Sequence, residues 1–93
     1  MLALLTPEEV QAALSQLPGW SQDGDTIIKF FRFKSYLDGA AFIDRVANAA
    51  DAADHHPDIA LGFRRVAVTL TTHSAKGITQ KDMALATQIE ELV

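Results

Sequence analysis

Hydrophobic and polar positions alternate along the chain with spacings that predict helices and strands in a definite order. The first apolar set recurs three or four residues apart, as one face of a helix does. It consists of Val10, Ala13, Leu14 and Leu17. Thr6-Pro7-Glu8-Glu9 precedes it with a capping residue, a proline at the first helical position and a glutamate at the third. We therefore expect a first helix that begins at Pro7 and stops at Pro18-Gly19.

A β-hairpin and a longer helix are predicted next. Asp23-Gly24 is the best hairpin signal in the chain, and it separates a short strand opened by Trp20 from an Ile- and Phe-rich strand over residues 26–33. Ser35, with Asp38 three residues on, caps a second helix that runs to about Asp54. Small apolar residues fill more than one face of this helix: Ala40, Ala41, Ile43, Val46, Ala47 and Ala50. Such a surface suits the sheet and one further neighbour.

A second pair of strands and a last helix complete the pattern. The strands cover residues 58–63 and 65–73, and a loop follows over residues 74–77. Thr79-Gln80-Lys81-Asp82 caps the last helix. Its inward side chains are expected to be Met83, Ala86, Ile89 and Val93. The order α-β-β-α-β-β-α predicts an α+β domain, in which the helices pack on one face of a sheet.

Composition narrows the classes of function. The chain has 93 residues, 48% hydrophobic and 22% charged, so we expect a single domain over residues 1–93. Without cysteine it has no disulfides and no thiolate chemistry, which suits a cytoplasmic protein. No stretch approaches the roughly 20 apolar residues of a membrane span. The net charge of -4 argues against direct nucleic-acid binding. A core this small also favours self-association.

The histidines are the strongest chemical signal. His55 and His56 are adjacent and stand directly before Pro57, which disfavours helical backbone at the preceding residue. The second helix is therefore expected to end at about His55, with both imidazoles on its last turn. His73 is expected at the end of the last strand. If that strand returns alongside the helix end, three groups that titrate near neutral pH meet in one place.

Three kinds of chemistry suit such a cluster. Three histidines and a carboxylate satisfy zinc, but adjacent residues point about 100° apart on a helix and to opposite sides of a strand, which makes a shared ion less favourable. Nucleophilic catalysis at Ser74 lacks a Gly-x-Ser-x-Gly turn. Proton transfer is favoured, because imidazole acts as an acid or a base near neutral pH. One positioned group of this kind accelerates a reaction by about 10²–10⁴-fold.

An ordered set of residues surrounds these histidines. An acid, three residues and His-His-Pro are followed by an aromatic residue, Thr-His at a strand end and a Thr-x-x-Asp helix start. The residues that carry this pattern are Asp51-Ala52-Ala53-Asp54-His55-His56-Pro57-Asp58, Phe63, Thr72-His73, Gly77-Ile78-Thr79 and Asp82. Leu17-Pro18-Gly19-Trp20 and the Phe-rich strand add to it upstream. Over nearly all 93 residues, the chain resembles the pterin-4a-carbinolamine dehydratase family.

The resemblance implies a fold and a reaction. The family fold is a four-stranded antiparallel sheet with three helices on one face. Its members dehydrate 4a-hydroxytetrahydropterin, the product that aromatic amino acid hydroxylases leave, to quinonoid dihydropterin and water. This recycles the pterin without a metal, nucleotide or redox cofactor. The family also forms homodimers through sheet edges and homotetramers through helices.

The resemblance further implies roles for individual residues. His55 and His73 would be the acids on either side of the 4a-carbon, and His56 would bind the pterin and help to move its N–H proton. Asp51 stands one helical turn before His55, where a carboxylate orients the ring. Asp51, Phe63 and Asp82 are the candidate substrate-binding residues. Asp82 also has a capping position, and Phe63 suits the core or a pocket wall.

Three positions depart from the usual family residues, and two other functions stay open. Asp51 replaces a common glutamate, Ser74 a frequent acid, and Lys76 a small residue. The first alternative function is that of a non-catalytic dimerisation or transcriptional cofactor, which the animal member of the family also has and which depends on the Ala-rich helix. The second is a role in molybdopterin metabolism.

Overall fold

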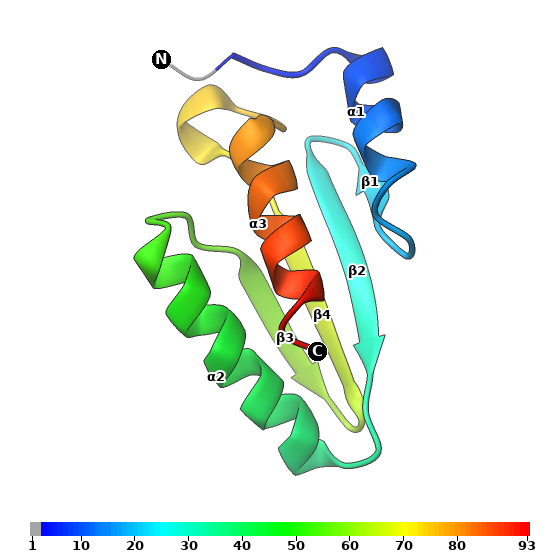
Figure 1. Ribbon diagram of the computed structural model, residues 1–93, viewed down its shortest axis with the longest axis vertical. Helices are drawn as coiled ribbons and strands as arrows, with labels where there is room; N and C mark the ends of the chain where they lie inside the picture. Colours follow the sequence, from blue (N-terminus) through cyan, green and yellow to red (C-terminus); the bar gives the residue numbers. More distant parts are fainter. Residues whose placement is uncertain (1–2) are drawn as a thin grey trace.

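The chain folds into a four-stranded antiparallel sheet with all three helices on one face (Figure 1). The computed structural model describes residues 3–93. The strand order in the sheet is β1-β2-β4-β3. The elements are α1 (Pro7–Leu14), β1 (Ser21–Asp23), β2 (Thr26–Arg32), α2 (Tyr36–Ala52), β3 (Asp58–Gly62), β4 (Arg65–Leu70), the 3-10 turn η1 (His73–Ala75) and α3 (Gln80–Glu90). The predicted order of elements and the predicted fold class are confirmed.

All three helices begin at the caps that the sequence predicts. The Thr6 side chain accepts from the Glu9 N–H, while the Glu9 carboxylate accepts from the Thr6 N–H. The Ser35 hydroxyl accepts from the Asp38 N–H at 3.1 Å. Thr79 and Asp82 form a second capping box at the start of α3. Each cap satisfies N–H groups that the first helical turn leaves without a partner.

The sheet register places alternate side chains in the core. β4 pairs with β2 and with β3, so that Val66 lies opposite both Phe31 and Leu61. Val66, Val68 and Leu70 are fully buried beneath α2 and α3. α3 lies over the middle of the sheet, α2 lies along the β3 side and α1 along the β1 side (Figure 1). The other face of the sheet carries Phe30, whose side chain is 54% exposed.

Several boundaries differ from the prediction. α1 ends at Leu14, because Gln16 and Leu17 N–H groups bond three residues back and continue the chain in tighter turns. His73 lies in η1, three residues beyond the end of β4 and outside the strand. Val93 is 64% exposed, because α3 ends at Glu90 and position 93 no longer follows the helical repeat. No helix within residues 3–93 is both long enough and apolar enough to cross a bilayer.

The apolar residues of α2 differ in how far they are buried. Ala50 and Val46 are buried, and Ala40 and Ile43 are half-buried. Ala41 and Ala47 are exposed. The helix therefore keeps apolar surface on the side that faces away from the sheet.

Candidate active site

A capping motif at the end of α2 places the histidine pair. The Asp54 N–H donates to the Asp51 carbonyl, and the His55 N–H donates to the Ala50 carbonyl. Asp54 itself has a left-handed backbone with φ 51°. This is the Schellman arrangement, which closes a helix and turns the chain away from its axis. The helix therefore ends at Ala52, earlier than predicted, and both imidazoles follow it in the loop.

A short loop after β4 places the third histidine. Thr72 and Gly77 exchange backbone hydrogen bonds across this loop, and Lys76 turns it with a left-handed φ of 60°. His73 lies at the start of η1 inside the loop and is exposed. Within residues 3–93, its ring makes no side-chain hydrogen bond. Its imidazole is therefore open to a ligand.

The structure brings the three histidines around one hollow of about 320 Å³. The end of α2, the end of β4, η1 and the start of α3 supply its walls. The lining residues are Asp54, His55, His56, Thr71, Thr72, His73, Ser74 and Lys81. Three histidines thus line one hollow, although they come from two segments that lie 17 residues apart in sequence.

His55 is held from below by a buried carboxylate. Its Nε2 atom lies 2.6 Å from Oδ1 of Asp82, and Asp82 has no exposed surface. The other carboxylate oxygen accepts from the Thr72 hydroxyl and from the Thr79 N–H, each at 2.8 Å. Taking a charged carboxylate out of water costs several kcal/mol unless hydrogen bonds replace the water. Here three donors replace it.

His56 has a looser partner. Its Nε2 atom lies 3.2 Å from Oδ1 of Asp51, and the two side chains are 60% and 86% exposed. The helical spacing pointed to a contact between Asp51 and His55, but the Schellman turn carries His55 inward. Asp51 therefore lies beside His56, and Asp82 takes the place of the orienting acid beside His55.

Asp51 does not line the histidine hollow, and the two other candidate substrate-binding residues lie outside it as well. Asp82 is the capping residue that the sequence suggested, but it is fully buried behind His55 and Thr72, which line the hollow. Phe63 belongs to the turn between β3 and β4. Figure 1 shows this turn at the end of the sheet opposite the end of α2 and the start of α3. Phe63 is 76% exposed and lines a different hollow with Arg32, Phe33 and Arg64, so it is not a core residue.

Four residues of the hollow were not among the predicted site residues: Asp54, Thr71, Ser74 and Lys81. The sequence pointed to Ser74 only as a nucleophile, which was disfavoured, and to Asp54 only as a part of the histidine pattern. It pointed to Thr72 only as a part of the Thr-His pattern. One signal was available, because an aspartate adopts the left-handed conformation more readily than most residues do. Asp54 before His55 thus marks a helix end. Nothing local marks Lys81, which the cap of α3 places at the rim.

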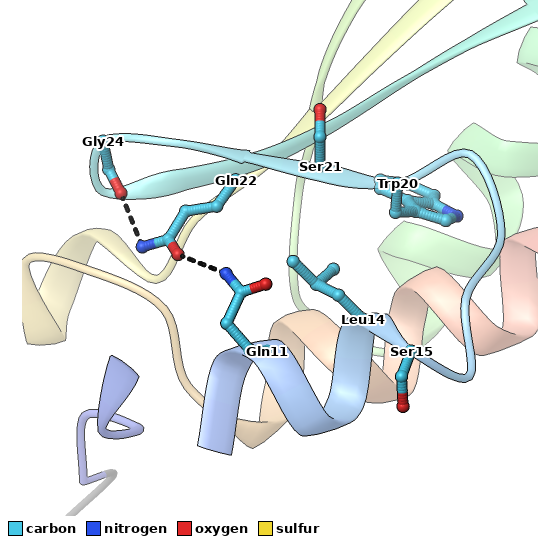
Figure 2. Close-up of a pocket in the computed structure, with 7 residues that line it drawn as sticks. All are labelled: Gln11, Leu14, Ser15, Trp20, Ser21, Gln22 and Gly24. Carbon is cyan, nitrogen blue, oxygen red and sulfur yellow. Dashed lines mark hydrogen bonds between the residues drawn. The ribbon is translucent and has the colours of Figure 1, made fainter. Parts of the chain in front are cut away.

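A larger hollow lies between α1 and the β1–β2 hairpin (Figure 2). Its volume is about 630 Å³. Gln11 donates to Gln22 at 3.3 Å, and Gln22 donates to the Gly24 carbonyl at 3.1 Å. Its lining residues are Gln11, Leu14, Ser15, Trp20, Ser21, Gln22 and Gly24, and none of the seven is an acid or a base near neutral pH. The histidine hollow is therefore the candidate active site.

The arrangement of imidazoles suits proton transfer at separate points of one ligand. Within the described residues 3–93, no three histidine, aspartate or glutamate side chains are placed to hold a metal ion together. His55 has a fixed orientation, and His73 and His56 are accessible at the rim. Such a set can give a proton at one position of a bound ring and take one at another.

The chain is similar to known proteins over nearly its whole length and nearly theirs. The sequence profile described as pterin 4 alpha carbinolamine dehydratase matches residues 3–92. A protein of Thermosynechococcus vestitus, provisionally named pterin-4-alpha-carbinolamine dehydratase, is 46% identical over 92 residues, which cover 99% of this chain and 97% of that protein. A protein of Natronomonas pharaonis with the same provisional name is 49% identical over 89 residues and covers 95% of this chain and 94% of its own.

Two solved structures with the same fold are also described as pterin dehydratases or as similar to them. A transcriptional coactivator/pterin dehydratase from Brucella melitensis superposes with a TM-score of 0.91 at 34% identity, covering 96% of this chain and 97% of its own. A pterin dehydratase-like protein, identified as a RuBisCO assembly factor in the alpha-carboxysome, superposes with a TM-score of 0.65 at 26% identity. It covers 78% of this chain and 84% of its own. By its sequence, its fold and its histidine motif, the chain belongs to the pterin-4a-carbinolamine dehydratase family.

Proposed function

We propose that this protein dehydrates 4a-hydroxytetrahydropterin to quinonoid dihydropterin and water by histidine acid–base catalysis. The observation that carries the proposal is the hollow that all three histidines line, with His55 oriented by the buried Asp82. Family membership supports the same reaction.

The reaction needs two proton transfers. Hydroxide is a poor leaving group near neutral pH, so an acid must protonate the 4a-hydroxyl as the carbon–oxygen bond breaks. The neighbouring nitrogen supplies the electron pair that forms the new carbon–nitrogen double bond, and a base takes the N–H proton. The products are one water molecule and the quinonoid ring. No electrons are exchanged with another reactant, and the proposal includes no cofactor.

The hollow supplies a residue for each transfer. We assign His55 and His73 as the acids near the 4a-carbon, because both line the hollow and they belong to different segments, the turn after α2 and η1. His56 binds the pterin and helps to move the N–H proton, and Asp51 orients its ring. Asp82 positions His55 and does not contact substrate. Phe63 has no role in the hollow of its own subunit.

The test is a stopped assay of 4a-hydroxytetrahydropterin loss, with and without protein. We expect the protein to accelerate the loss and chelator-treated protein to keep its full rate. The matched control is the His55→Ala/His73→Ala double variant, which should return the rate to the uncatalysed value. Equal rates for wild type and double variant would reject the mechanism. A rate lost to chelator and restored by zinc would support the metal alternative.

The second candidate function is that of a non-catalytic interaction protein. Two observations favour it: one solved relative is described as a transcriptional coactivator as well as a dehydratase, and another as an assembly factor. Such a role would use the exposed side of α2, including Ala41, and would leave the three histidines unused. The assay separates the two functions, because an interaction protein alone leaves the rate unchanged. A role in molybdopterin metabolism would require another pterin as substrate in the same assay.

The proposal extends to the setting of the protein. We infer that it forms a homodimer or homotetramer in the cytoplasm, with a small pterin as its substrate and without direct contact to nucleic acid or membrane. The absence of cysteine and the negative net charge support this setting. The oligomer follows from exposed apolar surface on α2 and on the open face of the sheet.

A further inference from the structure

Two hydrogen-bonded hydroxyl groups lie behind the histidine hollow. The Thr72 hydroxyl lies 2.8 Å from Oδ2 of Asp82 and 2.8 Å from the Thr79 hydroxyl. Thr72 is 3% exposed, and Thr79 and Asp82 have no exposed surface. The three side chains come from the end of β4 and the start of α3, and with His55 they form one buried network.

The direction of these hydrogen bonds follows from the number of protons. An ionised carboxylate only accepts, so the single hydroxyl proton of Thr72 goes to Asp82. Thr72 then has no proton left for Thr79, and the Thr79 hydroxyl must donate to Thr72. The Thr79 oxygen in turn accepts from the Lys81 N–H at 3.2 Å. Every bond in the network therefore points toward the carboxylate.

The same count fixes the tautomer of His55. A carboxylate that accepts on Oδ1 needs a proton on Nε2 of His55, so the neutral ring has its lone pair on Nδ1. Within residues 3–93, Nδ1 has no hydrogen-bond partner in the protein. This nitrogen is not fully buried, and His55 lines the hollow. Nδ1 is thus the ring nitrogen that is available to a ligand.

We propose that Thr72 is a positioning residue: its hydroxyl, oriented by Thr79, keeps Asp82 as an acceptor, so that His55 exchanges protons with the substrate through Nδ1. The assignment of a substrate proton rests on the proposed dehydratase function. The tautomer does not, because it is a property of the free protein. Without the Thr72 hydroxyl, the carboxylate loses one of the two donors to Oδ2, and Oδ1 is held less firmly against Nε2. The single ring proton of neutral His55 then lies on Nδ1 in a larger share of molecules, with no change in the number of protons.

The experiment compares Thr72→Val with Thr72→Ser. Valine has nearly the shape of threonine without the hydroxyl, and serine keeps the hydroxyl. Long-range ¹⁵N–¹H correlation spectra at mildly alkaline pH distinguish the protonated ring nitrogen from the bare one. The His55 signals are assigned by their loss in His55→Ala. We expect the proton on Nε2 in wild type and in Thr72→Ser, and a larger share on Nδ1 in Thr72→Val.

The kinetic readout is the turnover number. We expect Thr72→Val to lower kcat by about 10-fold, which is the size of effect that one lost hydrogen bond to a carboxylate can have, with KM within about twofold of wild type. Thr72→Ser should restore kcat. Thr87→Val is the control, since its hydroxyl bonds to the Met83 carbonyl in α3 outside the network. It should leave both tautomer and kcat unchanged.

Two results would overturn the proposal. One is a wild-type spectrum with the His55 proton on Nδ1. This result would reject the proposed tautomer, and it can be obtained even if Thr72→Val does not fold. The other is a folded Thr72→Val with the tautomer and kcat of Thr72→Ser. If wild type shows no dehydration at all, the proposed function fails, while the spectra of the wild type and of Thr72→Val still decide the role of Thr72.

Discussion

At the scale of single residues, the three histidines differ in how firmly the protein holds them. His55 is 9% exposed and bonded to Asp82, whereas His56 and His73 are exposed. His55 is therefore held in one orientation, and it also supplies a hydrogen bond to a carboxylate that has no access to water. Among residues 3–93, the two exposed histidines have no buried partner of this kind. The same substitution should therefore have different effects at these positions.

We predict that His55→Ala and His73→Ala both slow dehydration but differ in stability. Each variant should lose about 10²–10⁴-fold in kcat if its imidazole is an acid or base of the reaction. His55→Ala should also lose about 1–3 kcal/mol of unfolding free energy, because it removes a donor from buried Asp82. His73→Ala should stay within about 0.5 kcal/mol of wild type. His56→Ala should mainly raise KM.

Steady-state kinetics and urea unfolding on the same preparations check this series. Equal stability of His55→Ala and His73→Ala would contradict the geometry of the buried pair. It would instead agree with the expectation from sequence alone, which placed all three histidines at element ends outside the core.

The sequence predicted the histidine cluster but not its supports. His55-His56-Pro57 and Thr72-His73 are visible as local patterns, and the topology brings them together. The partner of His55 stands 27 residues away in sequence, where no local spacing points to it. Helical spacing predicted Asp51 as the partner of His55. This spacing does not apply, because the Schellman turn at Asp54 ends the helix before His55.

At the scale of elements, helix starts were predictable and helix ends were not. The starts depend on side chains within four residues, such as Thr6 with Glu9 and Thr79 with Asp82. The ends depend on backbone turns that competing tertiary contacts decide. The two capping boxes also differ in setting, since the first is exposed and the second lies beneath the candidate active site.

We predict that Thr6→Ala and Thr79→Ala separate stability from activity. Thr6→Ala should cost about 1 kcal/mol of unfolding free energy and leave kcat unchanged, because its cap serves α1 alone. Thr79→Ala should cost about 2 kcal/mol, because the lost hydroxyl is fully buried, and it should also lower kcat. Thermal melts and the dehydration assay measure both effects. A Thr79→Ala variant with wild-type kcat would show that the cap of α3 and the chemistry of His55 are independent.

At the scale of the whole molecule, apolar surface is left over after the core is complete. Leu37 is 75% exposed at the start of α2, and Ala41 is exposed one turn later. Phe30 is 54% exposed, on the face of the sheet opposite the three described helices. A chain of 93 residues has a small core, so burying such surfaces against a copy of itself adds stability that one chain lacks. Closed symmetric pairing is the common outcome.

We predict that the protein is a homodimer or homotetramer, and that Ala41→Glu loosens it. A glutamate at this exposed position places a charge on the apolar side of α2, so the assembled state should lose stability while each chain still folds. Ala41 is preferred to Ala47 for this test, because Ala47 lines a hollow together with His56 and its substitution can disturb that histidine directly. Ala12→Glu on the exposed side of α1 is the matched control and should leave the assembly intact. Light scattering at micromolar concentration measures the mass of all three proteins. A monomer mass for wild type would defeat the idea of self-association, and an intact Ala41→Glu oligomer would place the interface elsewhere, with the open sheet face around Phe30 as the next surface to test.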